Sequence, residues 1–382
     1  MKILFLVYHG FDPASGITKK IHAQIKGLRQ NGHEVHVCTY DHAENGHMCR
    51  FIDDVVIEDY GTGTCAAIRQ RVSYGSIYKY CIEQKVELVY ARSYMNATPP
   101  LTRFFRKLRK AGVRSVMEIP TYPYDHEYKG YDWNQQMRLC IDKLCRHALA
   151  KQFDRIITFS DEERIFGTET IRISNGIDLD EIPLHKAGKD CSREVHIIAV
   201  AEVHTWHGFD RFIYGLGEYY QKYGGKPQRD VVFHIVGQVW PSLMNGTAQA
   251  PGFAPYINKY GIADKLVFHG KLFGKELDTV FDQCVFAVGS LARHRSGITA
   301  IKTLKNREYA CRGIPFVYSE HDSDFEKQPY IMKVPADETP VNIEDVLHFI
   351  DGFDMAPIEI RKTVEHLSWR LQMKEVLDQL YS

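Results

Sequence analysis

The chain has 382 residues, which is more than one hydrophobic core ordinarily holds and suits two domains of roughly 100 to 200 residues each. Its 44% hydrophobic, 12% aromatic and 25% charged residues are typical of a folded protein and exclude collagen-like, disordered and low-complexity classes. The 48 basic and 48 acidic residues balance, so the composition predicts no nucleic-acid partner.

Apolar runs without charge are short, Cys284 to Ala292 being typical, whereas a membrane-spanning helix needs roughly 20 residues. Ile3 to Tyr8 is too short for the core of a signal peptide and lacks a cleavage site after it. We therefore expect a cytoplasmic protein. The 9 cysteines form no C-x-x-C pair, which favours buried thiols over a disulfide framework or a zinc site.

The first half of the chain alternates strand-like and helical patterns. Ile3 to Val7 is an unbroken apolar run, as in a strand buried on both faces, and a helical pattern over Ile17 to Leu28 leads to a second strand at Val35 to Val37. Further strands are predicted at Val55 to Ile57, Leu88 to Tyr90, Val113 to Met117 and Arg155 to Thr158, with a helix at Met137 to Lys151. This alternation predicts a doubly wound parallel sheet.

A second alternation starts after a stretch rich in turn residues between Ser174 and Glu194. The predicted strands are Val195 to Val200, Val231 to Val236, Leu266 to Phe268, Cys284 to Val288 and Ile314 to Tyr318. A last helical pattern covers Ile358 to Tyr381. We therefore predict two α/β domains, residues 1–178 completed by a helix at 358–382, and residues 179–357.

The strongest local pattern is the helix start Thr303 to Tyr309, followed by Arg312-Gly313-Ile314-Pro315. Lys305 and Glu308 are three residues apart and share a helix face. A helix N-terminus attracts phosphate, a lysine there adds positive charge, and a glutamate one turn later can accept hydrogen bonds from ribose hydroxyls. The pattern suits a nucleoside diphosphate, although an ordinary surface ion pair explains it about as well.

Several segments together resemble one known family. They are Ser15-Gly16-Ile17, Asn31-Gly32-His33-Glu34-Val35, Asn175-Gly176-Ile177-Asp178, Trp206-His207-Gly208-Phe209-Asp210-Arg211, Val236-Gly237 and the stretch from Lys305 to Pro315. In this order they resemble the retaining glycosyltransferases of the GT-B fold, family 4, also called group 1 glycosyltransferases. The resemblance spans nearly the whole chain. It implies two Rossmann-like domains facing a cleft, with the C-terminal helix crossing back to the first domain.

The resemblance also implies the reaction. A sugar would pass from a nucleotide diphosphate sugar of the UDP or GDP type to a glycan or lipid-linked acceptor, with retention of configuration. A role in bacterial-type surface polysaccharide or glycoconjugate synthesis would fit. No cofactor and no metal are expected. Glu308 matches the glutamate that holds the ribose in the family.

Two departures from the family pattern concern the donor site. The family has another glutamate eight positions before the one matching Glu308, in contact with the donor sugar, and here that position is Ala300. Its usual arginine and lysine after the first strand of the second domain are replaced around Glu202 and His207. Cations at His207, Arg211, Arg293, Arg295 and Lys302 are candidates to neutralise the departing diphosphate. Helix capping by His207 and solvated arginines are the alternatives.

On the first domain, Gly16, Arg92 and Glu118 each follow a predicted strand and are expected to meet the acceptor. A simple turn, a solvated arginine and a cap are the plainer interpretations of these three residues. The residues predicted to act in catalysis are Glu118, His207, Arg211 and Lys305. The residues predicted to bind the donor are Gly16, His207, Arg211, Gly237, Lys305, Asn306 and Glu308. The residues predicted to bind the acceptor are Gly16, Arg92 and Glu118.

A basic helix with Arg103, Arg106, Lys107, Arg109 and Lys110 suggests peripheral contact with a membrane surface, or simply a solvated face. A nucleotide-sugar isomerase or epimerase of the same architecture is the nearest alternative function. A nicotinamide dehydrogenase is disfavoured, because the glycine pattern Gly61-Thr62-Gly63 lacks the acidic residue expected after the next strand. A non-catalytic sensor of sugar nucleotides stays open.

Overall fold

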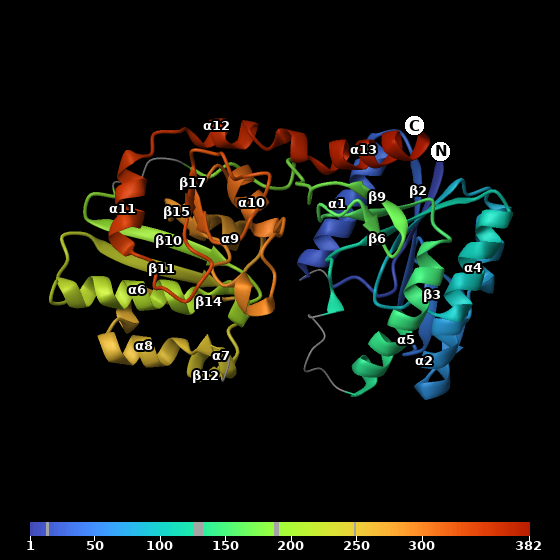
Figure 1. Ribbon diagram of the computed structural model, residues 1–382, viewed down its shortest axis with the longest axis horizontal. Helices are drawn as coiled ribbons and strands as arrows, with labels where there is room; N and C mark the ends of the chain where they lie inside the picture. The colour runs from blue at the N-terminus through green and yellow to red at the C-terminus, as the bar shows by residue number, and fades with distance from the viewer. Residues whose placement is uncertain (13–14, 126–132, 187–190, 248–249) are drawn as a thin grey trace. The chain divides into compact units, whose positions relative to one another are not determined.

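The computed structural model describes residues 1–12, 15–125, 133–186, 191–247 and 250–382. Its helices and strands form two compact units (Figure 1). Unit one comprises Met1–Gly176 and Ser368–Ser382, and unit two comprises Ile177–Leu367. Each unit is described by itself. Among the described residues, no helix combines the length and the apolar character that crossing a membrane requires.

Unit one is built on one mixed sheet. Its strands are β1 (Lys2–Leu6), β2 (Glu34–His42), β3 (Met48–Ile52), β4 (Val55–Gly61), β5 (Leu88–Arg92), β6 (Arg114–Ile119), β7 (Arg155–Thr158), β8 (Arg164–Ile165) and β9 (Thr168–Arg172). They lie in the order β4-β3-β2-β1-β5-β6-β7-β9-β8. The stretch from β2 to β9 is parallel, whereas β3, β4 and β8 pair antiparallel.

The antiparallel edge differs from the parallel sheet that the sequence predicts. Only Asp53 and Asp54 link β3 to β4, and both have positive φ, 47° and 65°. A two-residue link with this backbone closes a hairpin, because a parallel connection needs a dozen or more residues. The run at Val55 to Ile57 is therefore the outer arm of a hairpin.

Helices cover both faces of this sheet. They are α1 (Gly16–Gln30), α2 (Gly63–Val72), α3 (Gly75–Glu83), α4 (Pro99–Lys110), α5 (Trp133–Ala150) and α13 (Trp369–Tyr381). Ile3 and Phe5 of β1 pack in the core that α1 and α13 share, whereas Leu4 and Leu6 pack in the core on the opposite face. Burial on both faces explains why the β1 sequence is apolar without alternation.

The end of the chain belongs to both units. The sequence predicts one helix from Ile358 to Tyr381, but the structure has α12 (Pro357–Lys362), a 3-10 turn η5 (Glu365–Leu367) and then α13. Ile360, Val364 and Leu367 are buried in the core of unit two, so the chain returns to unit one at Ser368 rather than at residue 358. Ser368 starts α13 as its N-cap and accepts a hydrogen bond from the Leu371 amide at 3.4 Å.

A glycine lets α13 lie directly on α1. A Cβ atom at Gly27 would be 2.7 Å from the carbonyl oxygen of Trp369, so only glycine allows the two backbones to approach this closely. Met373 and Val376 then continue the contact into the apolar core. Within unit one, α13 is therefore a core element.

Unit two contains a parallel sheet in the order β14-β11-β10-β15-β16-β17. Its strands are β10 (Glu194–Val200), β11 (Asp230–Val236), β14 (Leu266–Gly270), β15 (Phe286–Val288), β16 (Phe316–Tyr318) and β17 (Ile331–Lys333), with a small hairpin of β12 (Gly246–Thr247) and β13 (Ala250–Pro251). Its helices are α6 (Phe209–Lys222), α7 (Pro241–Asn245), α8 (Phe253–Tyr260), α9 (Gly274–Phe281), α10 (Leu304–Arg312), α11 (Ile343–Gly352) and α12. The 3-10 turns are η2 (Thr205–His207), η3 (Ala263–Lys265) and η4 (Arg293–Ser296).

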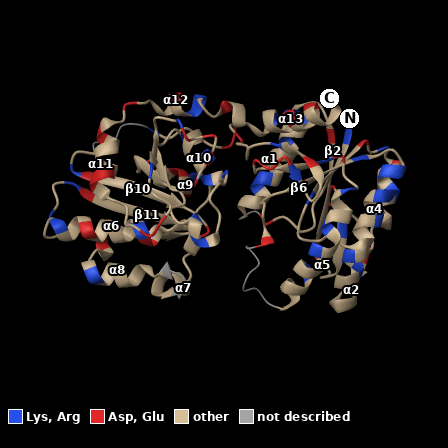
Figure 2. Ribbon diagram, in the orientation of Figure 1, with Lys and Arg blue, Asp and Glu red and all other residues tan. Residues whose placement is uncertain are grey.

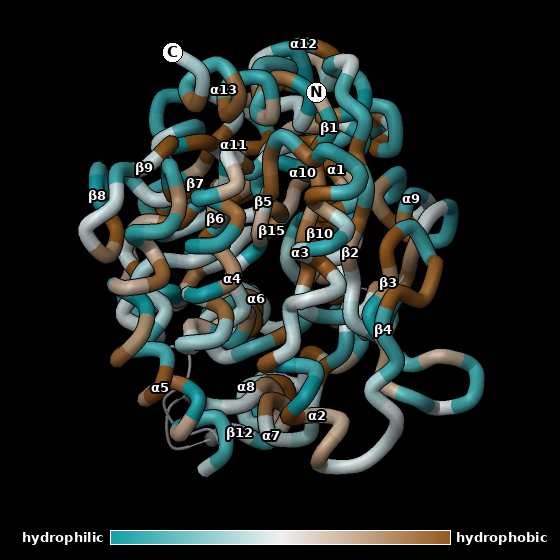
Figure 3. The backbone as a smooth tube through the Cα atoms, turned by 90° about the vertical axis from the view of Figure 1, so that its right-hand side faces the viewer, coloured by the Kyte–Doolittle hydropathy of each residue, from teal (hydrophilic) through white to brown (hydrophobic). Residues whose placement is uncertain are grey.

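Hydrophobic strands separate two helical layers in unit two. Ile197 and Ala199 of β10 face the core under α6 and α11, and Ile198 faces the core under α9 and α10. β15 consists of Phe286, Ala287 and Val288 and is hydrophobic along its whole length (brown in Figure 3). Parallel strands end at one edge of the sheet, so the residues that follow β11, β15 and β16 lie along the same edge.

Candidate functional site

The start of α10 lies at this edge of the sheet, beside the carboxyl ends of the strands. Thr303 is the N-cap of α10, and its Oγ1 accepts a hydrogen bond from the Asn306 amide at 3.4 Å. The amides of Leu304 and Lys305 belong to the first turn, which has no intrahelical acceptors. The Lys305 side chain is half-buried, and its ammonium makes no hydrogen bond or ion pair with the described residues. The first turn of α10 therefore combines free amides with an unpaired cation.

Glu308 lies one turn further along α10, and one of its two carboxylate oxygens is bound by an arginine of the same helix. Its Oε1 accepts hydrogen bonds from Nε of Arg312 at 3.0 Å and ion-pairs with Nη2 of Arg312 at 2.9 Å. Arg312 is fixed in turn by Asp278 at 2.8 Å. The Glu308 side chain is 29% exposed, and its Oε2 has no partner within the described ranges. One carboxylate oxygen is thus oriented and available.

Buried polar groups without partners lie at the ends of β15 and β16. Glu320 follows β16 and is 2% exposed, and Ser290 follows β15 and is 0% exposed. Neither oxygen of the Glu320 carboxylate, nor the Ser290 hydroxyl, has a hydrogen-bond partner in the described part of the chain. Such groups are costly to leave unpaired, so they mark a place where a ligand can supply the missing bonds.

Charge acts across this cluster. Burial lowers the pKa of Lys305, and the positive charge of Arg293 lowers it further, while Glu320 opposes both. Burial raises the pKa of Glu320, while its own backbone amide and the charges of Arg293 and Lys305 oppose that rise. The two shifts move an acid and a base toward neutral pH in one place, which is a common property of functional sites.

His207 is a neutral histidine beside these cations. It ends η2 and is 5% exposed, and its Nδ1 accepts a hydrogen bond from the His204 amide at 2.9 Å. Burial, followed by the charges of Lys305, Arg293 and His204, holds the pKa of His207 well below its ordinary value. The ring therefore carries its proton on Nε2 and can donate one hydrogen bond. The Nδ1 contact is the capping role that the sequence leaves open.

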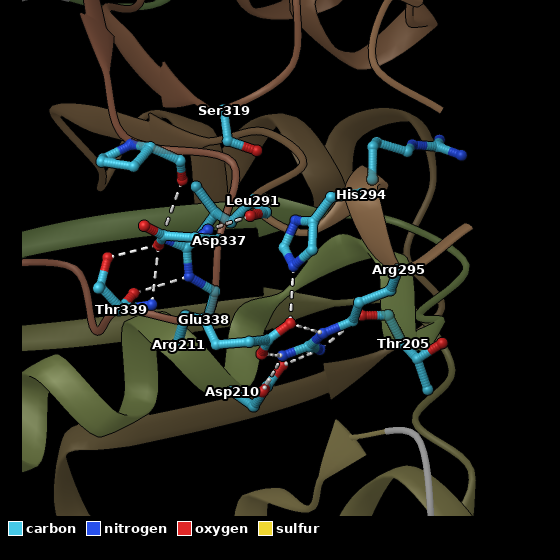
Figure 4. Close-up of polar contacts among 12 residues, drawn as sticks. Thr205, Asp210, Arg211, Leu291, His294, Arg295, Ser319, Asp337, Glu338 and Thr339 are labelled. Carbon is cyan, nitrogen blue, oxygen red and sulfur yellow. Dashed lines mark hydrogen bonds and ion pairs between the residues drawn. The ribbon is translucent and has the colours of Figure 1, made fainter. Parts of the chain in front are cut away.

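Arg211 has a structural role, in contrast to the predicted phosphate contact (Figure 4). Its guanidinium, 2% exposed, donates to the carbonyl oxygens of Thr339 at 2.7 Å, Pro335 at 3.1 Å and Leu291. It also pairs with Asp337 at 3.4 Å. These contacts fix the loop after β17 to α6, and the role of Arg211 as a donor ligand and catalytic cation stays a prediction.

The guanidinium of Arg295 is also bound by protein groups. It forms two hydrogen bonds with Asp210, at 2.9 and 2.8 Å, and donates to the Thr205 carbonyl at 2.8 Å (Figure 4). It pairs with Glu338 at 2.5 Å, and His294 also contacts Glu338 at 2.7 Å. Arg293 differs, because its guanidinium lies 5.7 Å from the Trp206 ring centre and acts electrostatically on both Lys305 and Glu320.

Asn306 and Gly237 make structural contacts next to the site. The Asn306 side chain, predicted to bind the donor, is 0% exposed and donates to Asp322 at 3.2 Å, so it points into the interior. Gly237 has φ +134°, and a Cβ atom there would be 1.7 Å from the Ala201 carbonyl oxygen. Only glycine fits at the end of β11. The donor contacts predicted for Asn306 and Gly237 both stay predictions.

Of the residues at the two departures from the family pattern, Glu202 and Ala300 are exposed, whereas His207 is buried. Glu202 is exposed after β10, and Ala300 is exposed and forms a parallel bridge with His321. The amide of Ile301 donates to the His321 carbonyl at 2.9 Å, and the His321 amide donates to Thr299 at 2.8 Å. These bonds place the segment 299–301 alongside Glu320. The edge at Ala300 therefore borders a buried carboxylate.

In unit one, the predicted acceptor residues Arg92 and Glu118 form a buried cluster. Glu118 is a residue of β6, rather than of the loop after it, and is 0% exposed. Its oxygens accept from Tyr90 and Gln24, both at 2.6 Å, and ion-pair with Lys20 at 3.5 Å and Arg92 at 3.4 Å. Burial raises the pKa of Glu118, but Lys20 and Arg92 outweigh it, and the net shift is downward.

The expectation that Arg92 and Glu118 meet the acceptor stays a prediction, and the structure shows the two side chains paired with each other. Arg92 is 7% exposed and so is not the solvated arginine of the plainer interpretation. Glu118 pairs with both Lys20 and Arg92 in the interior of unit one. Gly16 is different, because it is the first residue of α1 and a Cβ atom there would meet nothing within 4 Å. The backbone at Gly16 is therefore open to a ligand.

The described residues contain no group of three or more His, Cys, Asp or Glu side chains placed to hold a metal ion. The site in unit two consists of Lys305, Glu308, His207, Glu320 and Ser290, with Arg293 nearby. It offers positive charge, free amides and two carboxylates, which suits a ligand with both phosphate and hydroxyl groups. Sequence reasoning missed Glu320 and Ser290, although both directly follow strands that it predicted.

No family model matches the chain, and no curated protein sequence matches it. Solved structures do resemble it. Sucrose-phosphate synthase from Thermosynechococcus elongatus aligns with 100% of this chain and 99% of its own, with a TM-score of 0.62 and 14% identity. HepE of Anabaena, solved in complex with UDP and glucose, aligns over 100% of both chains with a TM-score of 0.60 and 15% identity.

A third structure, an α,α-trehalose-phosphate synthase from Burkholderia xenovorans in complex with glucose-6-phosphate, aligns over 100% of both chains with a TM-score of 0.57 and 12% identity. These proteins are glycosyltransferases of the GT-B fold. The similarity extends over both units. The chain therefore has the GT-B fold, with two Rossmann-like α/β domains, which confirms the fold class predicted from the sequence.

Proposed function

We propose that this protein is a retaining glycosyltransferase that moves a sugar from a UDP- or GDP-sugar to a glycan or lipid-linked acceptor. The observation that supports this most is the start of α10, where an unpaired Lys305 and a free oxygen of Glu308 lie one turn apart. This arrangement suits the diphosphate and ribose of a nucleotide. The GT-B neighbours, one of them solved with UDP and glucose, support the same function.

In the proposed complex, the diphosphate binds the free amides of α10 and the Lys305 ammonium. Arg293 adds charge from the adjacent turn, and Glu308 accepts hydrogen bonds from the ribose through Oε2. The bond between the sugar C1 and the diphosphate oxygen breaks, and the acceptor oxygen bonds C1 on the same face. The acceptor proton leaves with the nucleoside diphosphate. Cations at the diphosphate stabilise the charge that develops on it.

His207 is proposed to donate a hydrogen bond from Nε2 to the diphosphate or the donor sugar. Its lowered pKa keeps the ring neutral at physiological pH, so it contributes a directed donor rather than a charge. Metal independence follows as an expectation, since Lys305 and Arg293 supply charge where a metal ion would otherwise act. Arg211 and Glu118 then act only through the elements that they hold.

The acceptor is proposed to bind unit one, with the open backbone at Gly16 as its nearest contact. Basic side chains gather on α4 (blue in Figure 2), and α5 exposes Trp133 by 73% and Leu144 by 79%. Exposed aromatic and aliphatic side chains near basic ones favour contact with an anionic lipid surface. This combination supports a lipid-linked acceptor and a role in bacterial-type surface polysaccharide or glycoconjugate synthesis at the cytoplasmic face of a membrane.

A nucleotide-sugar isomerase or epimerase is the second candidate. It is favoured by one observation, the opposite pKa shifts of Lys305 and Glu320, because an acid and a base near neutral pH are what proton exchange at a sugar carbon needs. An isomerase converts the donor without any acceptor, whereas a transferase releases nucleoside diphosphate only as the acceptor is glycosylated.

The deciding experiment combines binding and turnover. Isothermal titration with UDP, GDP, dTDP and CMP identifies the nucleotide, and the matching nucleotide sugars are then incubated with and without glycan or lipid-linked acceptors. We expect nucleotide affinity to fall at least tenfold in both Glu308→Ala and Lys305→Ala, since each removes a charged hydrogen bond. EDTA is expected to leave the rate unchanged.

Glu359→Ala serves as a matched control on the exposed helix α12, where the carboxylate caps only its own helix. Its nucleotide affinity should equal that of the wild type. If a folded wild-type protein binds none of these nucleotides, the proposed function is wrong. Conversion of a nucleotide sugar without any acceptor would select the isomerase instead, and activity lost with EDTA and restored by Mn²⁺ or Mg²⁺ would contradict metal independence.

A further inference from the structure

Glu320 is unusual among the buried carboxylates of this protein. Glu118, Asp142, Asp210 and Asp322 are similarly buried, and each accepts at least two hydrogen bonds or ion pairs within the described residues. Glu320 is 2% exposed, yet neither of its side-chain oxygens has a partner there. A buried carboxylate without partners is unfavourable, so its missing hydrogen-bond donors must come from elsewhere.

The surroundings of Glu320 define which donors are missing. Lys305 and Arg293 are near enough to act on it electrostatically, but neither donates a hydrogen bond to it in the described structure. The Ser290 hydroxyl, at the end of the neighbouring strand, is also buried and unpartnered. The segment 299–301 borders Glu320 through the bridge between Ala300 and His321. No other described residue donates a hydrogen bond to the carboxylate, and its own backbone amide is the one donor that acts on its pKa.

The chain fixes Glu320 firmly in this position. The His321 amide binds the Thr299 carbonyl at 2.8 Å, and the Ser319 amide binds the Ser290 carbonyl at 3.0 Å. Lys333 of β17 donates to the backbone carbonyl of Glu320 itself. The backbone on both sides of the carboxylate is thus held by neighbouring strands, and the side chain is presented by a rigid element rather than by a free loop.

A carboxylate accepts hydrogen bonds from neighbouring hydroxyl groups, and a cation beside it accepts phosphate. Lys305 acts electrostatically on Glu320, and Glu308 is one turn, or about 4.5 Å along the helix axis, beyond Lys305 on α10. A cation that is near one carboxylate and shares a helix with another suits the diphosphate of a nucleotide sugar, which has sugar hydroxyls at one end and ribose hydroxyls at the other.

We propose that Glu320 binds hydroxyl groups of the transferred sugar and thereby determines which sugar the protein accepts. The proposal rests on the proposed function, since it assigns the sugar end of the same nucleotide-sugar ligand. A site built to hydrogen-bond a hydroxyl rejects an analogue that lacks it, because the buried group is then left unpaired. Glu320 is thus a specificity residue for the sugar and has no contact with the nucleotide.

The test measures two affinities in each protein by isothermal titration, that of the nucleoside diphosphate and that of the nucleotide sugar. UDP with UDP-glucose and UDP-galactose, and GDP with GDP-mannose, are the probes. We expect Glu320→Gln to leave the nucleoside diphosphate affinity equal or higher, because a negative charge near the diphosphate is removed. The ratio of nucleotide-sugar to nucleotide affinity should fall about 10- to 100-fold, as expected for losing a charged hydrogen bond.

Glu308→Gln is the matched control, because it makes the same chemical change at the ribose end. It should weaken nucleoside diphosphate and nucleotide sugar by the same factor and leave their ratio unchanged. Titration of the wild-type protein with nucleotide sugars whose sugar lacks the 2-, 3-, 4- or 6-hydroxyl group tests the proposal without any variant. At least one deoxy donor should bind the wild type at least tenfold more weakly than its parent, and Glu320→Gln should bind that pair equally.

The outcomes separate the two proposals. A wild type that binds no nucleoside diphosphate and no nucleotide sugar overturns the proposed function, and the assignment of Glu320 with it. A wild type that binds nucleotide, together with an unchanged affinity ratio in Glu320→Gln, overturns the assignment of Glu320 alone. Deoxy donors that all bind the wild type as tightly as their parents overturn it as well, even if the variant does not fold.

Discussion

Glu118 in unit one and Glu320 in unit two are buried to the same degree, but their surroundings differ. Glu118 accepts hydrogen bonds from Tyr90 and Gln24 and pairs with Lys20 and Arg92, and its pKa falls. Glu320 has no side-chain partner in the described structure, and its pKa rises. Burial is therefore no guide to function. The unmet hydrogen-bonding capacity of a buried charge is the better guide.

The same contrast separates two cations of unit two. Arg211 uses its guanidinium on three carbonyl groups and one carboxylate, whereas Lys305 makes no ion pair with the described residues. Both residues are predicted from the sequence to bind the diphosphate. Only Lys305 has hydrogen-bonding capacity left for a ligand. Substitutions at these charged residues test the contrast.

Glu118→Gln should lower the free energy of unfolding by about 3 to 5 kcal/mol, because it removes the buried carboxylate that pairs with Lys20 and Arg92. Equilibrium unfolding in urea measures the change. Glu83→Gln is the control, with the same chemical change at a carboxylate that is 59% exposed, and it should cost less than about 0.5 kcal/mol. Equal stability of the two variants, with acceptor kinetics impaired only in Glu118→Gln, would return Glu118 to the acceptor site.

Arg211→Lys should lower the free energy of unfolding by about 1 to 3 kcal/mol, because a lysine keeps the charge but cannot satisfy three carbonyl groups at once. Nucleotide affinity, measured by titration, should stay within threefold of wild type. Lys305→Met should give the reverse pattern, with weaker nucleotide binding and unchanged stability. A tenfold loss of nucleotide affinity in a fully stable Arg211→Lys protein would contradict the structural role.

Glu320→Gln at pH 8 should leave the free energy of unfolding unchanged or raise it by up to about 1 kcal/mol, because it removes an unpaired buried charge. Urea unfolding beside Glu118→Gln measures the difference between the two carboxylates directly. A loss of about 3 kcal/mol, as large as that of Glu118→Gln, would show that the free protein already satisfies Glu320.

Glu338→Gln should have the smallest effect, and the effect should depend on pH. Hydrogen bonds from Arg295 and His294 lower the pKa of Glu338 to about 2, so the folded protein binds this proton less readily than the unfolded chain. The stabilisation is present above pH 4.5 and is lost as the pH falls toward 2. The side chain is 58% exposed, so the loss at pH 7 should stay below about 1 kcal/mol.

Unfolding of Glu338→Gln and wild type at pH 7, 4.5 and 3 checks this prediction. The difference between the two proteins should shrink steadily at the lower pH values. Asp351→Asn is the comparison, because it removes an exposed carboxylate that pairs with Arg229 away from the network of Figure 4. A difference between Glu338→Gln and wild type that is constant at all three pH values would contradict the assigned pKa.

Sequence patterns predicted the fold well where the residues of a single helix or strand determine its structure. The run Ile3 to Val7 predicted β1 (Lys2–Leu6) because burial on both faces leaves no alternation, and the stretch Thr303 to Tyr309 predicted the start of α10. The hairpin of β3 and β4 was missed. Its inner strand carries Arg50, which looks like a surface residue but is 0% exposed beneath Tyr40, Tyr60 and Tyr74.

The candidate site was predictable only in part. Lys305 and Glu308 were found because their spacing on one helix is a local property. The roles of Arg211, Asn306 and Glu118 depend on partners far along the chain, such as Thr339 for Arg211 and Lys20 for Glu118. Glu320 follows a predicted strand, yet nothing in its neighbours in sequence indicates whether its carboxylate has a partner. Hydrogen-bond satisfaction is a property of the folded chain.

The return of α13 to unit one has a consequence for how the protein is made. The ribosome synthesises all of unit two before it reaches Trp369, Met373 and Val376, which complete one face of the unit one core. Residues 1–176 therefore leave the ribosome with that face uncovered, while unit two is a continuous segment that can fold as it emerges. Unit two is an insertion in unit one, and the core of unit one is complete only once α13 has been released.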